Sequence, residues 1–313
     1  LTHRTLTNDE LRNLMTELYD SSSIVTSVLG GERMDFAYTC RKGGRMGSRW
    51  RVCVNLRGTY DGIGFRVVCR QITILPPTIQ QVYMPQDIVD AVMKLDRGIM
   101  LVTGPTGSGK STTLAALLRH RMESIDHSDH LITIESPIEY LHTEYARPYS
   151  EVTQWEVPRM LTSFAYAVET SLRCDPDLVL VGEMRDLETI RLALTAAETG
   201  HLVFGTLHTS SAAKTIDRVV DVFPAAEKDM IRAMLSESLQ AVISQSLLKR
   251  QTGGRVAAHE IMIGTPAIRN LIRENKVAQM YSAIQTGANY GMTTLDQSLK
   301  TLVSKGVISP QVA

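Results

Sequence analysis

The sequence predicts an α/β protein in which a parallel sheet carries helices on both faces, with a small α+β domain before it and a helical segment after it. Three observations predict this fold. From about residue 85, short apolar runs alternate with helical stretches; the first 75 residues hold β-forming runs between glycine-rich turns; residues 264–313 are patterned as three or four short helices. A length of 313 residues is typical of about two domains.

Residues 1–75 are expected to form the small α+β domain. A capping-box pattern at residues 7–10 predicts the start of a helix, because apolar residues follow it at helical spacing. Three β-forming runs come next, at 34–38, 49–56 and 64–70. Two prolines, Pro76 and Pro77, then interrupt the pattern, and residues 76–84 are predicted to be a linker.

Residues 85–263 are expected to form the core, and residues 264–313 a helical subdomain. The candidate core strands are short and apolar, at 98–103, 131–135, 177–181 and 202–206. A further strand at 255–263, after two glycines, would complete a hairpin. Ligands of open parallel sheets bind beyond the carboxyl ends of the strands, so polar residues that follow these runs are the candidates for a site.

A complete nucleotide-phosphate loop follows the first core strand. Its glycines let backbone N–H groups turn inward at a helix N-terminus, Lys110 offers positive charge to the β- and γ-phosphates, and Ser111 offers a hydroxyl to Mg²⁺. Strand, glycine-rich turn and helix are the context that this motif requires. We therefore expect a bound nucleoside triphosphate, held by Gly104, Pro105, Thr106, Gly107, Ser108, Gly109, Lys110, Ser111 and Thr112.

Carboxylates end two other apolar strands of the same domain. Glu183 ends one and Glu135 the other, with Glu139 four residues further on. In nucleotide hydrolases such carboxylates handle Mg²⁺ or the attacking water. The sequence leaves open which of Glu139 and Glu183 does which. His208 follows a third strand, where it is either a structural residue or a sensor of the γ-phosphate.

The composition argues against several other classes of protein. Lys plus Arg and Asp plus Glu are both 33 and aromatic residues are 5%, whereas proteins that track nucleic acid show a basic excess with aromatics between, so no direct nucleic-acid binding is expected. The four cysteines form no Cys-x-x-Cys pair, which argues against a zinc site or a disulfide framework. No apolar run approaches a membrane span of about 18 residues.

Four segments resemble, in order, the Walker A, Asp box, Walker B and His box of the secretion and type IV pilus traffic ATPases, at residues 104–111, 135–139, 181–186 and 200–209. The resemblance covers about residues 34–313. It implies a RecA-like P-loop ATPase core, a PAS-like small domain, and ATP with Mg²⁺ as cofactors. It also implies a homo-hexamer that is cytoplasmic and peripheral to the inner membrane, where inner-membrane components of a secretion or pilus machine are its partners.

The resemblance also implies roles for particular residues. Lys110 and Ser111 are expected to bind nucleotide and Mg²⁺, Glu139 and Glu183 to act in catalysis, and His208 to couple hydrolysis to motion. Glu183 would reach the metal through the nucleotide.

Arginines of the small domain are the remaining candidates. Arg70 lies where family members place a nucleotide-facing arginine, shortly before the linker, and Arg57 is a second candidate. Such arginines stabilise transition-state charge, often across a subunit boundary. The alternative for both is a solvated strand arginine.

The chain departs from the family pattern in three respects. Ser136 replaces the usual Asp of the Asp box, which leaves Glu135 and Glu139 as its carboxylates. The first helix and strands of the small domain are absent, so this domain is expected to be shortened. A four-cysteine metal site of the assembly-type members is also absent. Residues 186–291 resemble the pilus retraction branch, whereas the N-terminal half and the Asp box resemble the Dot/Icm secretion branch.

The predicted function is a hexameric ATP-hydrolysing motor of a type IV pilus retraction machine or of a Dot/Icm- or conjugation-type secretion machine. The sequence leaves the choice of machine open. One alternative is a nucleic-acid translocase or helicase, which the neutral charge and scarce aromatics oppose. Another is a nucleotide-dependent scaffold without hydrolysis, which the intact Lys110, Ser111 and Glu183 oppose.

Overall fold

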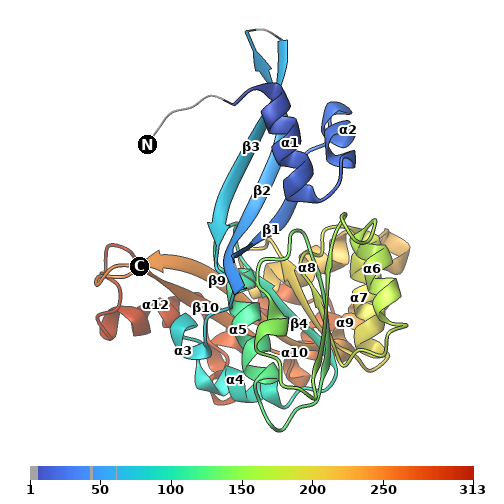
Figure 1. Cartoon of the computed structure of the whole chain (residues 1–313). Helices are drawn as coiled ribbons and strands as arrows, with labels where there is room; N and C mark the ends of the chain where they lie inside the picture. The colour runs from blue at the N-terminus through green and yellow to red at the C-terminus, as the bar shows by residue number, and fades with distance from the viewer. Residues whose placement is uncertain (1–5, 43–44, 61) are drawn as a thin grey trace.

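The computed structural model describes residues 6–42, 45–60 and 62–313, which form two sheets, each with its own hydrophobic core (Figure 1). The smaller sheet and its helices stand on top of the larger unit in this view. Among the described residues, no helix has the length and apolar character needed to cross a membrane.

The N-terminal unit is an antiparallel sheet of order β1-β2-β3, formed by β1 (Met34–Lys42), β2 (Arg45–Thr59) and β3 (Gly62–Ile72). Helix α1 (Asn8–Tyr19) begins at the predicted capping box, in which Thr7 and Glu10 bond to each other's backbone N–H groups. Helix α2 (Ser23–Leu29) follows it. Both helices pack on one face of the sheet, and the apolar side chains between them form a separate small core.

The core unit is a seven-stranded sheet of order β10-β9-β4-β8-β7-β5-β6. All neighbours pair in parallel except β9 and β10, which form an antiparallel hairpin. The strands are β4 (Gly98–Thr103), β5 (His130–Glu135), β6 (Glu151–Glu156), β7 (Leu178–Val181), β8 (Leu202–Leu207), β9 (Leu239–Lys249) and β10 (Arg255–Ile263). The carboxyl ends of β4, β5, β7 and β8 therefore lie at one edge of the sheet.

Helices cover both faces of this sheet, as the two buried clusters show. One face carries α3 (Ile79–Val82), α4 (Gln86–Met93) and α5 (Lys110–Met122). The other carries α6 (Phe164–Ser171), α7 (Leu187–Glu198), α8 (Ala212–Asp221), α9 (Lys228–Ser238), α10 (Pro266–Arg273) and α11 (Met280–Thr286). Helix α12 (Leu295–Ser304) packs beside β10, and short 3₁₀ turns occupy His142–Glu144, Ala225–Glu227, Val277–Gln279 and Ala288–Tyr290.

The predicted α/β class with a parallel sheet is confirmed, and the five predicted core strands lie within one or two residues of β4, β5, β7, β8 and β10. Two strands were not predicted. Strand β9 is buried along most of its length, so it lacks the alternation that marks a half-exposed strand. Strand β6 is a polar edge strand whose sequence, Glu-Val-Thr-Gln-Trp-Glu, has few strongly apolar residues.

Residues 76–84, predicted to be a linker, are only partly a connector. Thr78 and Gln81 form a second capping box that starts α3, and Ile79 and Met84 are buried in the cluster that includes α5. The second half of this segment is thus packed against the core unit, because it supplies apolar side chains to that unit's surface.

Candidate active site

The phosphate loop leaves β4 and enters α5 in a compact turn. Gly104, Gly107 and Gly109 have φ values of 141°, 80° and 88°, a region that glycine adopts without strain. A Cβ at Gly104 would lie only 2.3 Å from the carbonyl oxygen of Gln245 on β9. Glycine is therefore required at Gly104 both by the backbone angle and by the neighbouring strand.

Gln245, on β9, supports the phosphate loop through a side-chain hydrogen bond. This residue was not identified from the sequence. Its side chain is 1% exposed, and its Nε2 donates to the carbonyl oxygen of Ser108 at 2.6 Å. The carbonyl group of Ser108 is thus satisfied inside the protein by a side chain from β9. The hydrogen bond between Gln245 and Ser108 could not be predicted, because residues 108 and 245 are distant in sequence and meet only through the pairing of β4 with β9.

Lys110 lines a cavity of about 500 Å³. Its Nζ donates to the carbonyl oxygens of Gly104 (2.9 Å) and Pro105 (3.2 Å) and is 3.4 Å from Nδ1 of His208. Burial lowers the pKa of Lys110, and the nearby carboxylates of Glu183 and Glu139 oppose that shift. The ammonium group is therefore held in place by the loop itself, close to both acidic candidates.

Glu183 and His208 meet at the carboxyl ends of β7 and β8. Glu183 Oε1 accepts a hydrogen bond from Nε2 of His208 at 2.7 Å and forms an ion pair with Arg185. Because Lys110 can only donate, Nδ1 of His208 acts as the acceptor and Nε2 as the donor, an assignment that follows from the partners. Lys110, His208 and Glu183 thus form a continuous chain of hydrogen bonds.

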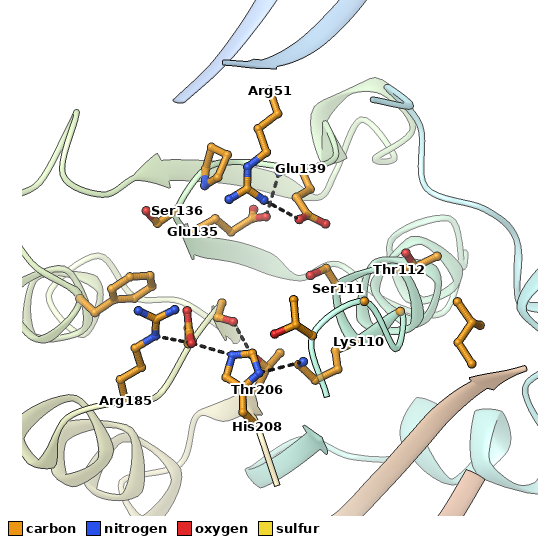
Figure 2. A pocket seen from close by; sticks show the side chains of 18 of the residues that line it. Arg51, Lys110, Ser111, Thr112, Glu135, Ser136, Glu139, Arg185, Thr206 and His208 are labelled. Carbon is orange, nitrogen blue, oxygen red and sulfur yellow. Dashed lines mark hydrogen bonds and ion pairs between the residues drawn. The ribbon is translucent and has the colours of Figure 1, made fainter. Parts of the chain in front are cut away.

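Glu135 ends β5 and Glu139 lies on the loop that follows it, on the opposite side of the cavity from His208 (Figure 2). Glu135 accepts from Thr133 Oγ1 (2.8 Å) and from the backbone N–H of Glu139 (3.3 Å). Burial raises the pKa of Glu135 to about 7, against the lowering effect of these hydrogen bonds. Glu139 is 36% exposed at its side chain, so it is the more accessible carboxylate of this loop.

Among the described residues of the small domain, Arg51 is the arginine that lines this cavity. It extends from β2 toward Glu139, as Figure 2 shows. Its Nη1 is 3.7 Å from Oε1 of Glu139. Sequence reasoning missed it and chose Arg70, which stands opposite Arg51 in the β2–β3 register but lines a neighbouring hollow. The alternation of residues along β2 contains the signal, since Arg49 and Arg51 share one face.

The remaining predicted residues divide between the cavity and its surroundings. Thr106, Ser111 and Thr112 line the cavity, and Oγ1 of Thr112 is 3.1 Å from the hydroxyl of Tyr140 on the Asp-box loop. Arg57 is exposed and pairs with Gly64 near the β2–β3 turn. It lines none of the hollows described here, so the cavity of its own chain does not include it.

These residues fit a nucleoside polyphosphate. The glycine angles give the loop an anion-binding backbone at the N-terminus of α5, beside a buried ammonium group. The hydroxyl of Ser108 is buried without a hydrogen-bond partner among the described residues, as a group that awaits a ligand or water would be. The hydroxyl of Ser111 and the carboxylate of Glu183 supply hard oxygen donors of the kind Mg²⁺ prefers.

The fold and this constellation define a phosphate-loop ATPase whose second acidic loop contacts a separate small domain. The family described as "Type II/IV secretion system protein" matches residues 64–311. The chain belongs to this family.

Two curated relatives show the similarity in detail. The chain is 60% identical over 266 residues to the "Type IV pilus retractation ATPase PilT" of Pseudomonas aeruginosa, which covers 85% of this chain and 74% of that protein. It is 56% identical over 253 residues to the "Twitching motility protein" of Neisseria gonorrhoeae, which covers 80% of this chain and 66% of that protein.

Solved structures agree over nearly the whole chain. The X-ray structure of the Legionella pneumophila ATPase DotB matches with a TM-score of 0.90 and 33% identity, covering 99% of this chain and 83% of that one. A crystal structure of the pilus retraction motor PilT with bound ADP matches with a TM-score of 0.84 and 40% identity, covering 98% and 83%. The predicted family and ATPase class are thereby confirmed, and both branches recognised in the sequence are among the relatives.

Proposed function

We propose that this ATPase works as a homo-hexamer that powers a type IV pilus or secretion machine, at the cytoplasmic face of the inner membrane and through membrane-embedded partner proteins. The observation that carries the proposal is the chain from Lys110 through His208 to Glu183, with separations of 3.4 Å and 2.7 Å. Through His208, this chain of hydrogen bonds connects the phosphate-binding lysine to a carboxylate at the end of a strand. A site that only bound nucleotide would not need such a connection.

The phosphate loop, Lys110, Ser111 and Thr112 would hold ATP, with Mg²⁺ held through Ser111 and Glu183. When bound, Mg²⁺ supplies charge neutralisation at the phosphates. Glu139 and Glu183 divide the handling of the metal and of the attacking water between them. Glu135, buried and with a raised pKa, supports the backbone of Glu139 rather than acting on water.

His208 would report the state of the nucleotide. Its two ring nitrogens contact Lys110 and Glu183, so a change at the phosphates alters both hydrogen bonds together. Arg51 would sense the same change from the small domain through Glu139.

The identity of 60% to a pilus retraction ATPase favours the retraction branch over the secretion branch. Restoration of twitching in a retraction-deficient strain would support this assignment. Failure there, together with rescue of a secretion-deficient strain, would contradict it and favour the secretion branch.

The enzymatic part of the proposal is tested by Lys110→Ala. We expect ATP turnover to fall by about 1,000-fold, because the phosphates lose their buried ammonium partner. Lys94→Ala, a change at an exposed lysine of α4's C-terminus, is the matched control and should keep full turnover. Unchanged ATPase activity in Lys110→Ala would remove the assignment.

A further inference from the structure

The loop that carries Glu139 is held at one residue from two sides. Arg49 Nη2 donates to the carbonyl oxygen of Ile138 at 2.8 Å, and Glu156 Oε2 accepts from the N–H of Ile138 at 3.1 Å. Both polar groups of Ile138 are thus bound by charged side chains. Such charge-assisted hydrogen bonds are stronger than those between neutral groups.

The two charged residues come from different parts of the molecule. Arg49 lies on β2 of the small domain, and Glu156 ends β6 of the core sheet. They are 6% and 2% exposed, so neither is free to exchange its partner for water. Glu156 also accepts from the backbone N–H of Ala37 on β1, at 3.3 Å to Oε2, and therefore binds the small domain as well as the loop.

Arg49 is itself fixed within the small domain. Its Nη1 donates to the hydroxyl of Thr39 on β1 at 2.6 Å. The guanidinium group therefore moves with the β1–β2 sheet. Because Nη2 of the same group holds Ile138, a displacement of that sheet must either break this bond or move the loop.

Glu139 is the residue that such a movement would displace. It directly follows Ile138, and its own N–H donates to Glu135 at the end of β5. Its carboxylate contacts Arg51, which lies two residues after Arg49 on the same face of β2. The small domain therefore contacts this loop at two points: Arg49 binds the backbone of Ile138, and Arg51 contacts the carboxylate of Glu139.

We propose that Arg49 and Glu156 are positioning residues that set the place of Glu139 in the active site according to the position of the small domain. This inference rests on the proposed role of Glu139 in hydrolysis. Neither residue lines the cavity of Lys110, so neither is a catalytic residue. Their effect is exerted through Ile138, and it makes hydrolysis depend on the contact between the two domains.

Arg49→Met and Glu156→Gln test this proposal, with Glu139→Gln as the reference. We expect kcat for ATP to fall by about 10- to 100-fold in both variants, because a displacement of about 1 Å of a catalytic group has an effect of this size. KM for ATP should stay within about twofold, since the phosphate loop is untouched. A double variant should lose little more than the more affected single variant, because both side chains act on one residue.

Arg159→Met is the matched control. Arg159 also joins the two domains, through hydrogen bonds to the carbonyl oxygens of Ala37 (3.4 Å) and Tyr19 (3.0 Å), but none of its hydrogen bonds goes to the loop of Glu139. Its ion pair with Glu156 is at 4.0 Å and goes to Oε1, whereas Ile138 is bound by Oε2. Its removal should lower thermal stability and leave kcat near the wild-type value. Arg49→Lys, which keeps the charge with fewer donors, should show the same direction as Arg49→Met if the latter does not fold.

The outcomes separate the two proposals. If Glu139→Gln stops turnover while Arg49→Met, Arg49→Lys and Glu156→Gln keep it, the positioning role is wrong and the role of Glu139 stands. An equal loss of kcat in Arg159→Met would also overturn the positioning role. The loss of any contact between the two domains would then be enough to lower kcat. Full turnover in Glu139→Gln would overturn the role of Glu139 itself, and the inference with it.

Discussion

The two sides of the active-site cavity are built in different ways. Lys110, Glu183 and His208 follow β4, β7 and β8, which are adjacent strands of one sheet. Glu135 ends β5 and Glu139 follows it, and the loop between them is held by residues of the small domain. We call the first the sheet side and the second the domain side of the cavity.

This difference indicates which side of the cavity is rigid and which side responds to movement of the small domain. The sheet side is fixed by the parallel pairing of buried strands, which resists displacement. The domain side depends on contacts such as Arg51 with Glu139 and Arg49 with Ile138, which hold only while the small domain keeps its place. Nucleotide binding should therefore depend mainly on the sheet side, and the rate of hydrolysis on both.

Among the carboxylates of the cavity, the largest effect should come from Glu183 on the sheet side. Glu183→Gln keeps the size of the side chain but loses its charge, so we expect turnover to fall by about 100- to 1,000-fold while ATP still binds. Turnover and nucleotide affinity, measured on the same preparation, separate the two effects. Glu188→Gln, at an exposed position of α7, is the control and should behave as wild type. Normal turnover in Glu183→Gln would remove this residue from the catalytic list.

The sheet side could be predicted from the sequence because its signals are local. The phosphate loop is contiguous, and Glu183 and His208 each stand just after an apolar strand, so sheet topology alone brings them together. The domain side could not be predicted in the same way. Arg51 reaches Glu139, 88 residues later, only because the small domain rests against the Asp-box loop. The alternation along β2 shows that Arg51 shares a face with Arg49, but it does not encode which loop of the core that face meets.

Glu135 should make the domain side sensitive to pH. Its pKa is about 7 in the folded chain against an ordinary value of 4.5, so below about pH 4.5 both states are protonated and its stabilising contribution is complete. As pH rises toward and through 7, the unfolded state loses the proton first and that contribution disappears, by about 3 kcal/mol in all.

Glu135→Gln removes this titration and keeps a hydrogen-bond acceptor for Thr133. The free energy of unfolding in urea, measured at pH 5 and pH 8 for both proteins, should therefore fall more for the wild type than for the variant. Parallel pH profiles would show that Glu135 is ionised in the folded chain at neutral pH, contrary to the expected shift.

Gln245 offers a test of the sheet side without touching a charged group. Gln245→Leu leaves the carbonyl group of Ser108 without its buried partner, which costs about 1–3 kcal/mol. We expect KM for ATP to rise by about tenfold, because the phosphate loop loses its brace. Gln240→Leu removes a similar bond from the same strand, to the carbonyl oxygen of Arg97 at the other end of β4, and should leave KM unchanged. Equal KM values in Gln245→Leu and Gln240→Leu would mean that the hydrogen bond from Gln245 to Ser108 does not hold the phosphate loop in its binding conformation.

The smallest effects should come from Arg51 and Arg70 of the small domain, and they decide which of these two arginines serves the site of its own chain. Arg51→Met should weaken ATP binding by about fivefold in dilute protein, since a partly exposed charged contact near the phosphates is worth about 1 kcal/mol. Arg70→Met should change it by less than about twofold, because Arg70 lines the neighbouring hollow instead. Binding of a fluorescent nucleotide at low protein concentration measures both. If Arg70→Met weakened binding as much as Arg51→Met, the nucleotide site would extend into the neighbouring hollow, which Arg51 and Glu139 also line. Nucleotide affinity as well as hydrolysis would then depend on the small domain.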